Sequence, residues 1–226
     1  MLGLAGRIAF LGGLAAFSPA DITPLMWHDA QQELESDGAP AVTLNDLSGN
    51  GHDIATADGD GPTFRTSGIN SLPSYEYDGV DDASGLILAP IDQPTIIVLV
   101  FEADSLAADM TITGGTNQSL TIESDGAITM DAGTPQTSAS GVITAATPAM
   151  VVATFDGASS SLRVNGADVA IGNPGTGDYE DPWIGAGHAT SQPFNGFLGE
   201  HLVFTGPLAP GAISQLEAYL TTRWGL

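Results

Sequence analysis

The sequence predicts an all-β domain, a two-sheet antiparallel sandwich that ends in one short helix. Glycine (29 residues) and proline (14 residues) recur along most of the chain, as expected where turns join many short strands. Short apolar or alternating segments lie between these turn residues, and only the C-terminus has helical spacing. A chain of 226 residues is long enough for one such domain with a sizeable core.

Individual strands can be placed from the same pattern. Two continuous β-branched runs, residues 95–102 and 150–155, predict strands that are buried on both faces. Residues 119–131 predict a hairpin, because apolar residues alternate on two arms around a Ser-Asp-Gly turn. Further short strands are expected at residues 75–77, 162–164, 183–185 and 197–204.

The C-terminal helix is predicted over residues 210–225. Pro210 suits the first helical turn, and Gly225 suits the stop. Ile213, Leu216 and Leu220 fall on one face of such a helix. We therefore expect the helix to cover one side of the sandwich.

The charge balance excludes several kinds of partner. The chain has 27 acidic residues, four arginines and no lysine, with a formal net charge of −23. Nucleic-acid binding needs clustered basic residues, and anionic membrane surfaces attract them, so neither partner is expected. The acidity is explained by solubility, with divalent-cation binding as the alternative. The absence of cysteine excludes disulfides and thiolate metal sites.

Residues 1–20 are apolar and rich in glycine, and they resemble a signal peptide only in part. Arg7 precedes an apolar run, but that run is too short to span a bilayer. An isolated apolar peptide of this kind would not order in water by itself. We expect residues 1–20 to form an anchoring arm that docks on a neighbouring subunit rather than on its own domain, residues 21–226.

A series of short motifs runs along residues 22–226. They are residues 27–30 (WHDA), 46–51 (DLSGNG), 68–73 (GINSLP), 77–82 (YDGVDD), 154–157 (TFDG), 162–166 (LRVNG), 184–185 (IG), 197–200 (FLGE) and 216–226. No single motif is specific, but in this order they resemble the LamG-like branch of the concanavalin A-like lectin/glucanase superfamily. The resemblance implies a jelly roll of two antiparallel sheets.

The resemblance also implies a function. Such domains are found in bacteriophage virion appendages and in bacterial surface proteins. We expect a non-catalytic virion structural protein, a head or tail fibre, spike or decoration, whose jelly roll binds host-surface glycan. Residues 1–20 would then contact other virion subunits in a homo-oligomer or larger assembly, on the virion surface and without membrane insertion. The alternative is a secreted or cell-surface bacterial glycan-binding module.

Catalysis is not expected, and no catalytic residue is nominated. The glucanases of this superfamily carry carboxylates at alternate positions of one strand, and that pattern is absent from the strand segments here. Glu33 and Glu35 have the spacing but lie in a loop-like segment. The four histidines show no metal-ligand spacing. A glycoside hydrolase is therefore disfavoured.

No cofactor is required by the sequence, but calcium is an alternative. Hard cations bind several oxygen ligands held by turns. Two turns are rich in such ligands, and relatives of this fold hold calcium at the rim of the sandwich. The more economical interpretation is that these side chains cap their own turns. The candidate ligands are Asp46, Asn50, Asp78, Asp81 and Asp82.

A glycan site needs an aromatic platform and polar groups that orient hydroxyls. Tyr179 and Trp183 lie near a segment rich in glycine, aspartate and proline, which makes them candidates for an exposed patch. His188, Gln192 and Asn195 follow and would add polar contacts. Packing of Trp183 in the core is the competing interpretation.

Overall fold

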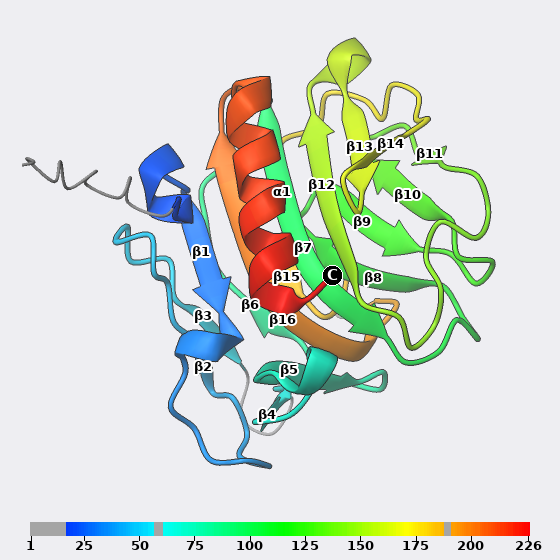
Figure 1. Ribbon diagram of the computed structural model, residues 1–226. Helices are drawn as coiled ribbons and strands as arrows, with labels where there is room; N and C mark the ends of the chain where they lie inside the picture. The colour runs from blue at the N-terminus through cyan, green and yellow to red at the C-terminus, as the bar shows by residue number, and fades with distance from the viewer. Residues whose placement is uncertain (1–16, 57–60, 188–190) are drawn as a thin grey trace, which may run out of the picture.

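The protein is described here by a computed structural model, which covers residues 17–56, 61–187 and 191–226. Two eight-stranded sheets pack face to face, and one helix lies across the outer side of the first sheet (Figure 1). All pairings between the strands are antiparallel. The predicted sandwich with a C-terminal helix is confirmed.

The first sheet, sheet A, contains the long apolar strands. Strand β16 pairs with β7 on one side, while its two halves pair with β5 and β1 on the other. In order, sheet A contains β14 (Ala167–Val169), β13 (Ser161–Val164), β12 (Ala149–Phe155), β7 (Thr95–Ala103), β16 (Asn195–Thr205), β5 (Ser74–Asp78) and β4 (Thr63–Arg65), with β1 (Met26–Asp29) paired to β16.

The second sheet, sheet B, is built from shorter strands. The predicted hairpin forms its β9–β10 pair. A β-bulge interrupts the register between β8 and β9. In order, sheet B contains β11 (Gln136–Thr137), β10 (Ile128–Asp131), β9 (Ser119–Ile122), β8 (Met110–Gly114), β15 (Trp183–Ile184), β6 (Ser84–Gly85), β3 (Ile54–Thr56) and β2 (Thr43–Leu44).

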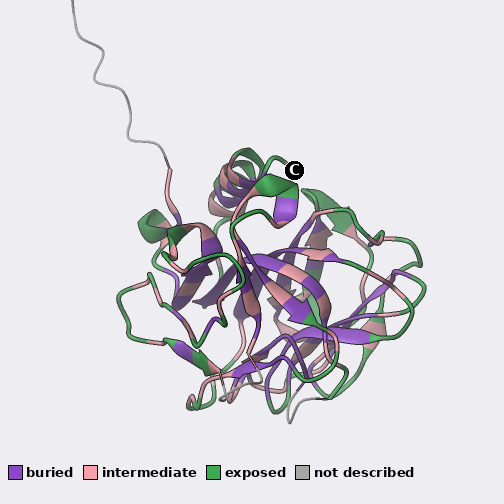
Figure 2. Ribbon diagram, turned by 90° about the horizontal axis from the view of Figure 1, so that it is seen from below, coloured by how far each residue is buried: buried purple, intermediate pink, exposed green. Residues whose placement is uncertain are grey.

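The central strands of sheet A are buried on both faces, which explains the unbroken apolar character of β7. One face meets sheet B in the main core, where Leu99, Leu120 and Ile184 are in the same cluster. The other face meets the helix α1 (Pro210–Trp224) through Val98, Leu216 and other apolar residues. Figure 2 shows the buried segments gathered inside and the exposed ones in the connecting loops and on the helix.

The helix begins and ends where the sequence predicts. Pro210 is in its first turn, and Gly225 ends it with φ 68°, in the left-handed region that glycine adopts at low cost. Short 3₁₀ segments connect other elements: η1 (Pro19–Ile22), η2 (Ala30–Gln32), η3 (Ile69–Ser71) and η4 (Gly157–Ser159).

The last described part of the predicted arm contacts the domain itself. Phe17 makes an edge-on contact with Tyr219 of α1, with ring centroids 6.2 Å apart, and Pro19 is buried. The rest of the predicted arm, residues 1–16, lies outside the described residues. Within the described ranges, no helix has the length and apolar character that crossing a membrane requires.

Candidate functional site

The outer face of sheet B carries a row of residues from five neighbouring strands. Side chains alternate between the two faces of a strand, and directly paired residues face the same side. Leu120, Met130 and Ile184 point into the main core, so their strand neighbours Ser119, Asp131 and Trp183 point outward. Strand pairing aligns these residues as Gly85, Trp183, Gly114, Ser119 and Asp131, which we call the outer row.

Trp183 forms an aromatic platform in this row. A Cβ atom added to Gly85 would lie 3.2 Å from each of Cδ2, Cε2 and Cε3 of the indole, so the ring lies flat over that glycine. A side chain at position 85 would therefore force the ring away from the sheet. Gly114, on the other side of Trp183, also adds no side chain. The indole is partly exposed, which is the condition for stacking on a ligand.

A cavity of about 260 Å³ opens beside the far end of the outer row. We call it the end cavity. The β8–β9 turn, the end of β10 and the loop around Gly177 form its walls, and most of its side chains are polar. Its lining residues are Gly115, Thr116, Asn117, Gln118, Ser119, Asp131, Ala132, Gly133 and Gly177.

Gln118 contributes an acceptor that is not used within the protein. The residue is 1% exposed and its Nε2 donates to the Gly177 carbonyl at 2.6 Å, but its buried Oε1 has no hydrogen-bond partner among the described residues. A buried polar atom without a partner is costly, so it favours a bound hydroxyl or water. Asn117 Nδ2 donates to Asp178 Oδ1 at 2.5 Å, and Gly133 N donates to Asp131 Oδ1 at 2.8 Å.

The residues nominated from the sequence as glycan contacts separate in the structure. Trp183 lies on the outer face of sheet B, as does Gln192, whose Oε1 accepts from the outward Thr111 at 3.1 Å. Tyr179 is fully buried, and its hydroxyl lies 2.8 Å from Thr113 Oγ1, so the expected exposure of Tyr179 is wrong. Asn195 is partly exposed at the start of β16 in sheet A, and His188 lies outside the described residues.

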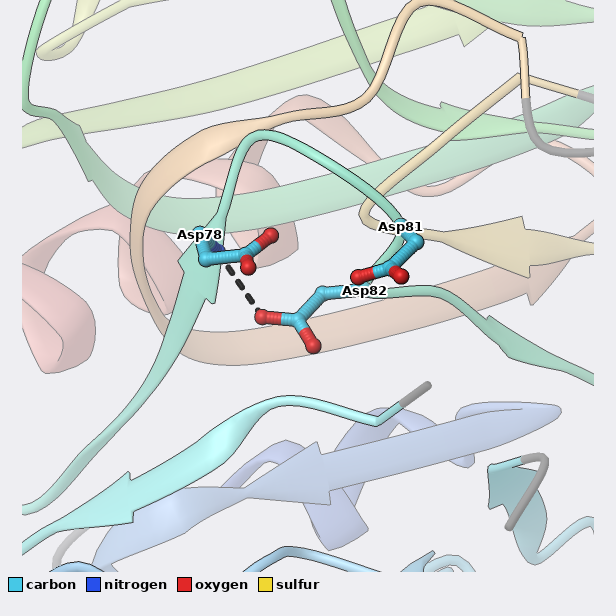
Figure 3. A group of neighbouring side chains, drawn as sticks. All are labelled: Asp78, Asp81 and Asp82. Atoms are coloured by element: carbon cyan, nitrogen blue, oxygen red, sulfur yellow. Dashed lines mark hydrogen bonds between the residues drawn. The ribbon is translucent and has the colours of Figure 1, made fainter. Parts of the chain in front are cut away.

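Three of the nominated calcium ligands come together in one turn. The carboxylates of Asp78, Asp81 and Asp82 each place an oxygen within 4.8 Å of the others, and they face one another across the turn after β5 (Figure 3). Asp82 Oδ2 accepts a hydrogen bond from Asp78 N at 2.8 Å. Burial, together with the neighbouring Asp78 and Asp81 charges, raises the pKa of Asp82 to about 6, although this hydrogen bond by itself lowers it.

The other two nominated ligands stabilise their own loop. Asp46 accepts hydrogen bonds from the amides of Trp27, Ser48 and His52. Partial burial by itself would raise the pKa of the Asp46 carboxyl, but the amide hydrogen bonds outweigh it and lower that pKa. The Asn50 side chain donates to carbonyls at residues 24 and 25, which attaches the loop to the chain before β1. Asp46 does not belong to the carboxylate group at residues 78–82.

Calcium binding at the turn therefore stays a prediction, and a melting experiment tests it. If the three aspartates bind calcium, millimolar calcium raises the melting temperature, EDTA reverses the rise, and Asp81→Asn abolishes it. Asp81 is exposed, so this substitution leaves the core unchanged. Equal melting temperatures in calcium and in EDTA would instead support turn capping as the role of these residues.

A larger cavity, of about 530 Å³, lies on the opposite side of the molecule, over α1. Phe17 and Tyr219 form much of its wall, and Arg223 also lines it. The guanidinium of Arg223 is already bound to Asp29. We take the outer row and the end cavity as the candidate site, because there a flat, partly exposed indole lies on the same face of sheet B as several polar side chains.

Comparison with known proteins supports the fold but identifies no family. No family model and no curated protein matches the sequence. Several solved structures match the fold of this chain. At identities of 12–16% these matches establish the fold alone.

The matched structures include a sialidase, one domain of an arabinanase and the binding domain of a mosquitocidal protein. A Trypanosoma rangeli sialidase in complex with sialic acid matches with a TM-score of 0.64 and 14% identity, over 93% of this chain and 34% of that one. Domain 4 of AbnA, a GH43 extracellular arabinanase from Geobacillus stearothermophilus, was solved with arabinotriose. It matches with a TM-score of 0.54 and 16% identity, over 80% of this chain and 100% of that domain. The binding domain of Paraclostridial Mosquitocidal Protein 1 matches with a TM-score of 0.64 and 12% identity, over 89% of this chain and 53% of that one.

These matches correct one expectation from the sequence. The chain spans about a third of the sialidase, so the sandwich is one part of that enzyme. The prediction that this protein falls outside the enzymes is contradicted, because sialidases and an arabinanase contain the same sandwich. The missing carboxylate pattern excludes only one arrangement of catalytic groups. Enzymes that share a fold can use other arrangements.

Proposed function

We propose that this protein is a glycan-binding domain whose site is the outer face of sheet B. The observation that carries the proposal is the outer row: a flat, partly exposed indole, two glycine positions without a side chain, then a hydroxyl and a carboxylate. Sugars present apolar ring faces that stack on aromatic side chains and hydroxyls that bind polar groups. Trp183 supplies the first kind of contact, and Ser119 and Asp131 supply the second.

The end cavity adds to this surface. Its exposed Asn117 side chain and the second oxygen of Asp131 are groups that hydroxyls can satisfy, whereas the Gln118 acceptor lies buried behind them. Support also comes from the arabinanase domain, which was solved with arabinotriose and is matched over its whole length.

Where the domain acts is a separate proposal. Display on a virion, with host attachment through glycan and assembly through residues 1–20, rests on the sequence alone and has no support from the comparisons. A secreted or cell-surface setting is equally compatible with a glycan-binding sandwich. Detection of the protein in purified virions or in the culture supernatant distinguishes the two settings.

Removing the platform tests the proposed site. We expect Trp183→Ala to weaken oligosaccharide binding by about tenfold or more, because the stacking surface is lost. The measurement is calorimetric titration of the full chain with ligands found on a neutral and acidic glycan array, with arabinotriose among them.

A matched control is Leu34→Ala, which shortens another large exposed side chain, one that is 98% exposed and lies in the loop after η2. This variant should bind like the wild type, and both variants should melt close to the wild-type temperature. Undiminished binding by Trp183→Ala would remove sheet B as the site, and the absence of binding to any glycan would reject the function.

A further inference from the structure

The outer face of sheet B differs from sheet A in charge. Among the described residues there are three arginines, and all belong to sheet A or to the helix that covers it. Arg65 is in β4, Arg163 is in β13, and Arg223 is in α1. The chain has no lysine, and Arg7 lies outside the described residues.

Each of these arginines is already bound to carboxylates. Arg65 Nε lies 2.5 Å from Glu76 Oε2, and Arg163 Nε lies 2.7 Å from Glu217 Oε1. Arg223 is bound to Asp29. None of the three can therefore neutralise an acidic ligand on the other sheet.

Charged groups near the proposed site are instead acidic. Asp131 is in the outer row itself, and Asp178 is hydrogen-bonded to Asn117 in the wall of the end cavity. Glu123 accepts from the outward Thr129 at 2.5 Å on the same face of the sheet. A ligand on this face meets carboxylates and, within the described residues of sheet B, no arginine.

We infer that the site takes an uncharged oligosaccharide and rejects acidic glycans. This inference rests on the proposed function and adds its specificity. Carboxylates form strong, charge-assisted hydrogen bonds with sugar hydroxyls. They repel the carboxylate or sulfate of an acidic sugar, and no arginine among the described residues of sheet B offsets that repulsion. The sialidase match is a likeness of fold, and we expect no binding of sialic acid here.

The geometry also defines how the ligand lies. Trp183 is in β15, and Asp131 is in β10, with β8 and β9 between them. Three strand spacings of about 4.8 Å separate them by roughly 14 Å. A chain of several sugars that crosses the strands reaches both groups, so affinity should rise from monosaccharide to trisaccharide.

A matched ligand pair tests the inference. Galactotriose and trigalacturonate differ in having a hydroxymethyl group or a carboxylate on each ring. We expect that the acidic member of this pair binds at least about tenfold more weakly than the neutral member in 0.15 M salt. The difference should narrow in 1 M salt, because salt screens exposed charges. Arabinotriose, xylotriose, cellotriose and maltotriose complete the neutral panel, and sialyllactose is compared with lactose.

Variants at one position identify the source of the discrimination. In Asp131→Asn the difference between neutral and acidic ligands should shrink, and in Asp131→Arg it should reverse. Asp21→Asn, which removes an acidic charge near the N-terminus, is the control and should leave the ratio unchanged. Equal or tighter binding of the acidic ligands by the wild type would overturn the inference and leave the proposed function standing. If no ligand of either kind binds, the proposed function itself fails.

Discussion

Replacing Arg223 with methionine should lower the free energy of unfolding above pH 8 by about 3–5 kcal/mol, because it leaves two buried carboxylates without a counter-charge. Asp29 and Glu200 face each other on paired strands, and the side chain of each is 0% exposed. Arg223 is bound to Asp29, and its Nε lies 3.7 Å from Glu200 Oε2. For a domain of this size the melting temperature should fall by roughly 10 °C.

The loss should depend on pH in a defined direction. Burial, with a contribution from the charge of Asp29, raises the pKa of Glu200 to about 8 although indole N–H groups of Trp27 and Trp224 donate to it. A carboxyl with a raised pKa binds its proton more tightly when folded, so its favourable contribution is complete at acidic pH and is lost as the pH rises toward 8. The penalty of Arg223→Met is therefore greatest above pH 8 and smaller near pH 5.

Urea unfolding followed by tryptophan fluorescence measures this penalty. Arg65→Met is the control, because the Arg65–Glu76 pair is exposed, with 38% and 31% of the two side chains accessible. Exposed ion pairs add little to stability, so the control should resemble the wild type. A similar loss in both variants would show that the burial of Asp29 and Glu200 is not the cause.

The outer row was predictable in part from the sequence. The hairpin at residues 119–131 has apolar residues at alternate positions, and this alternation requires that Ser119 and Asp131 face outward. The alternation does not predict the order of the strands in the sheet. Trp183 joins the row only because β15 inserts between β8 and β6, and no local pattern encodes that neighbour.

Tyr179 illustrates the opposite error. Its glycine-rich and proline-rich surroundings correctly predict an irregular segment, since residue 179 forms only an isolated bridge, to Ile91. Irregular backbone does not imply an exposed side chain, however. The ring fills the core, and its hydroxyl finds Thr113 as a buried partner, which is the usual condition for burying a tyrosine.

Contacts across long sequence separations were not predictable at all. The four histidines look scattered along the chain, yet His28 and His201, which are 173 positions apart in the sequence, are paired across β1 and β16. Their rings are stacked, with centroids 5.5 Å apart. The register of two strands from opposite ends of the chain brings the two histidines together. The spacing of residues in the sequence does not predict this contact.

The histidine pair should make the protein sensitive to acid. His28 Nε2 lies 3.0 Å from the His52 carbonyl, which can only accept, so Nε2 carries the proton and Nδ1 of neutral His28 is an acceptor. His201 Nδ1, 3.2 Å away, must then donate. The remaining His201 Nε2 is unprotonated and buried, with no hydrogen-bond partner among the described residues.

Burial lowers the pKa of both histidines, that of His201 to well below its ordinary value, and mutual repulsion of their positive charges adds to the shift in His201. A histidine whose pKa is depressed in the folded state takes up its proton more readily when unfolded. Stability is therefore lost as the pH falls below about 6.5, where the unfolded chain begins to bind these protons. Each such proton contributes about 1.4 kcal/mol per pH unit.

The variant His201→Asn isolates one of the two protons. The asparagine Nδ2 can donate where His201 Nδ1 donates, but it does not titrate. We expect the unfolding free energy to fall less in the variant between pH 6.5 and pH 5.5, by about 1 kcal/mol, because the unfolded histidine is half protonated at pH 6.5 and reaches the full slope only at lower pH. Other groups that titrate in acid are common to both proteins, so they cancel in the difference. Parallel curves for the two proteins would mean that His201 is already charged in the folded state, and the assigned proton positions would be wrong.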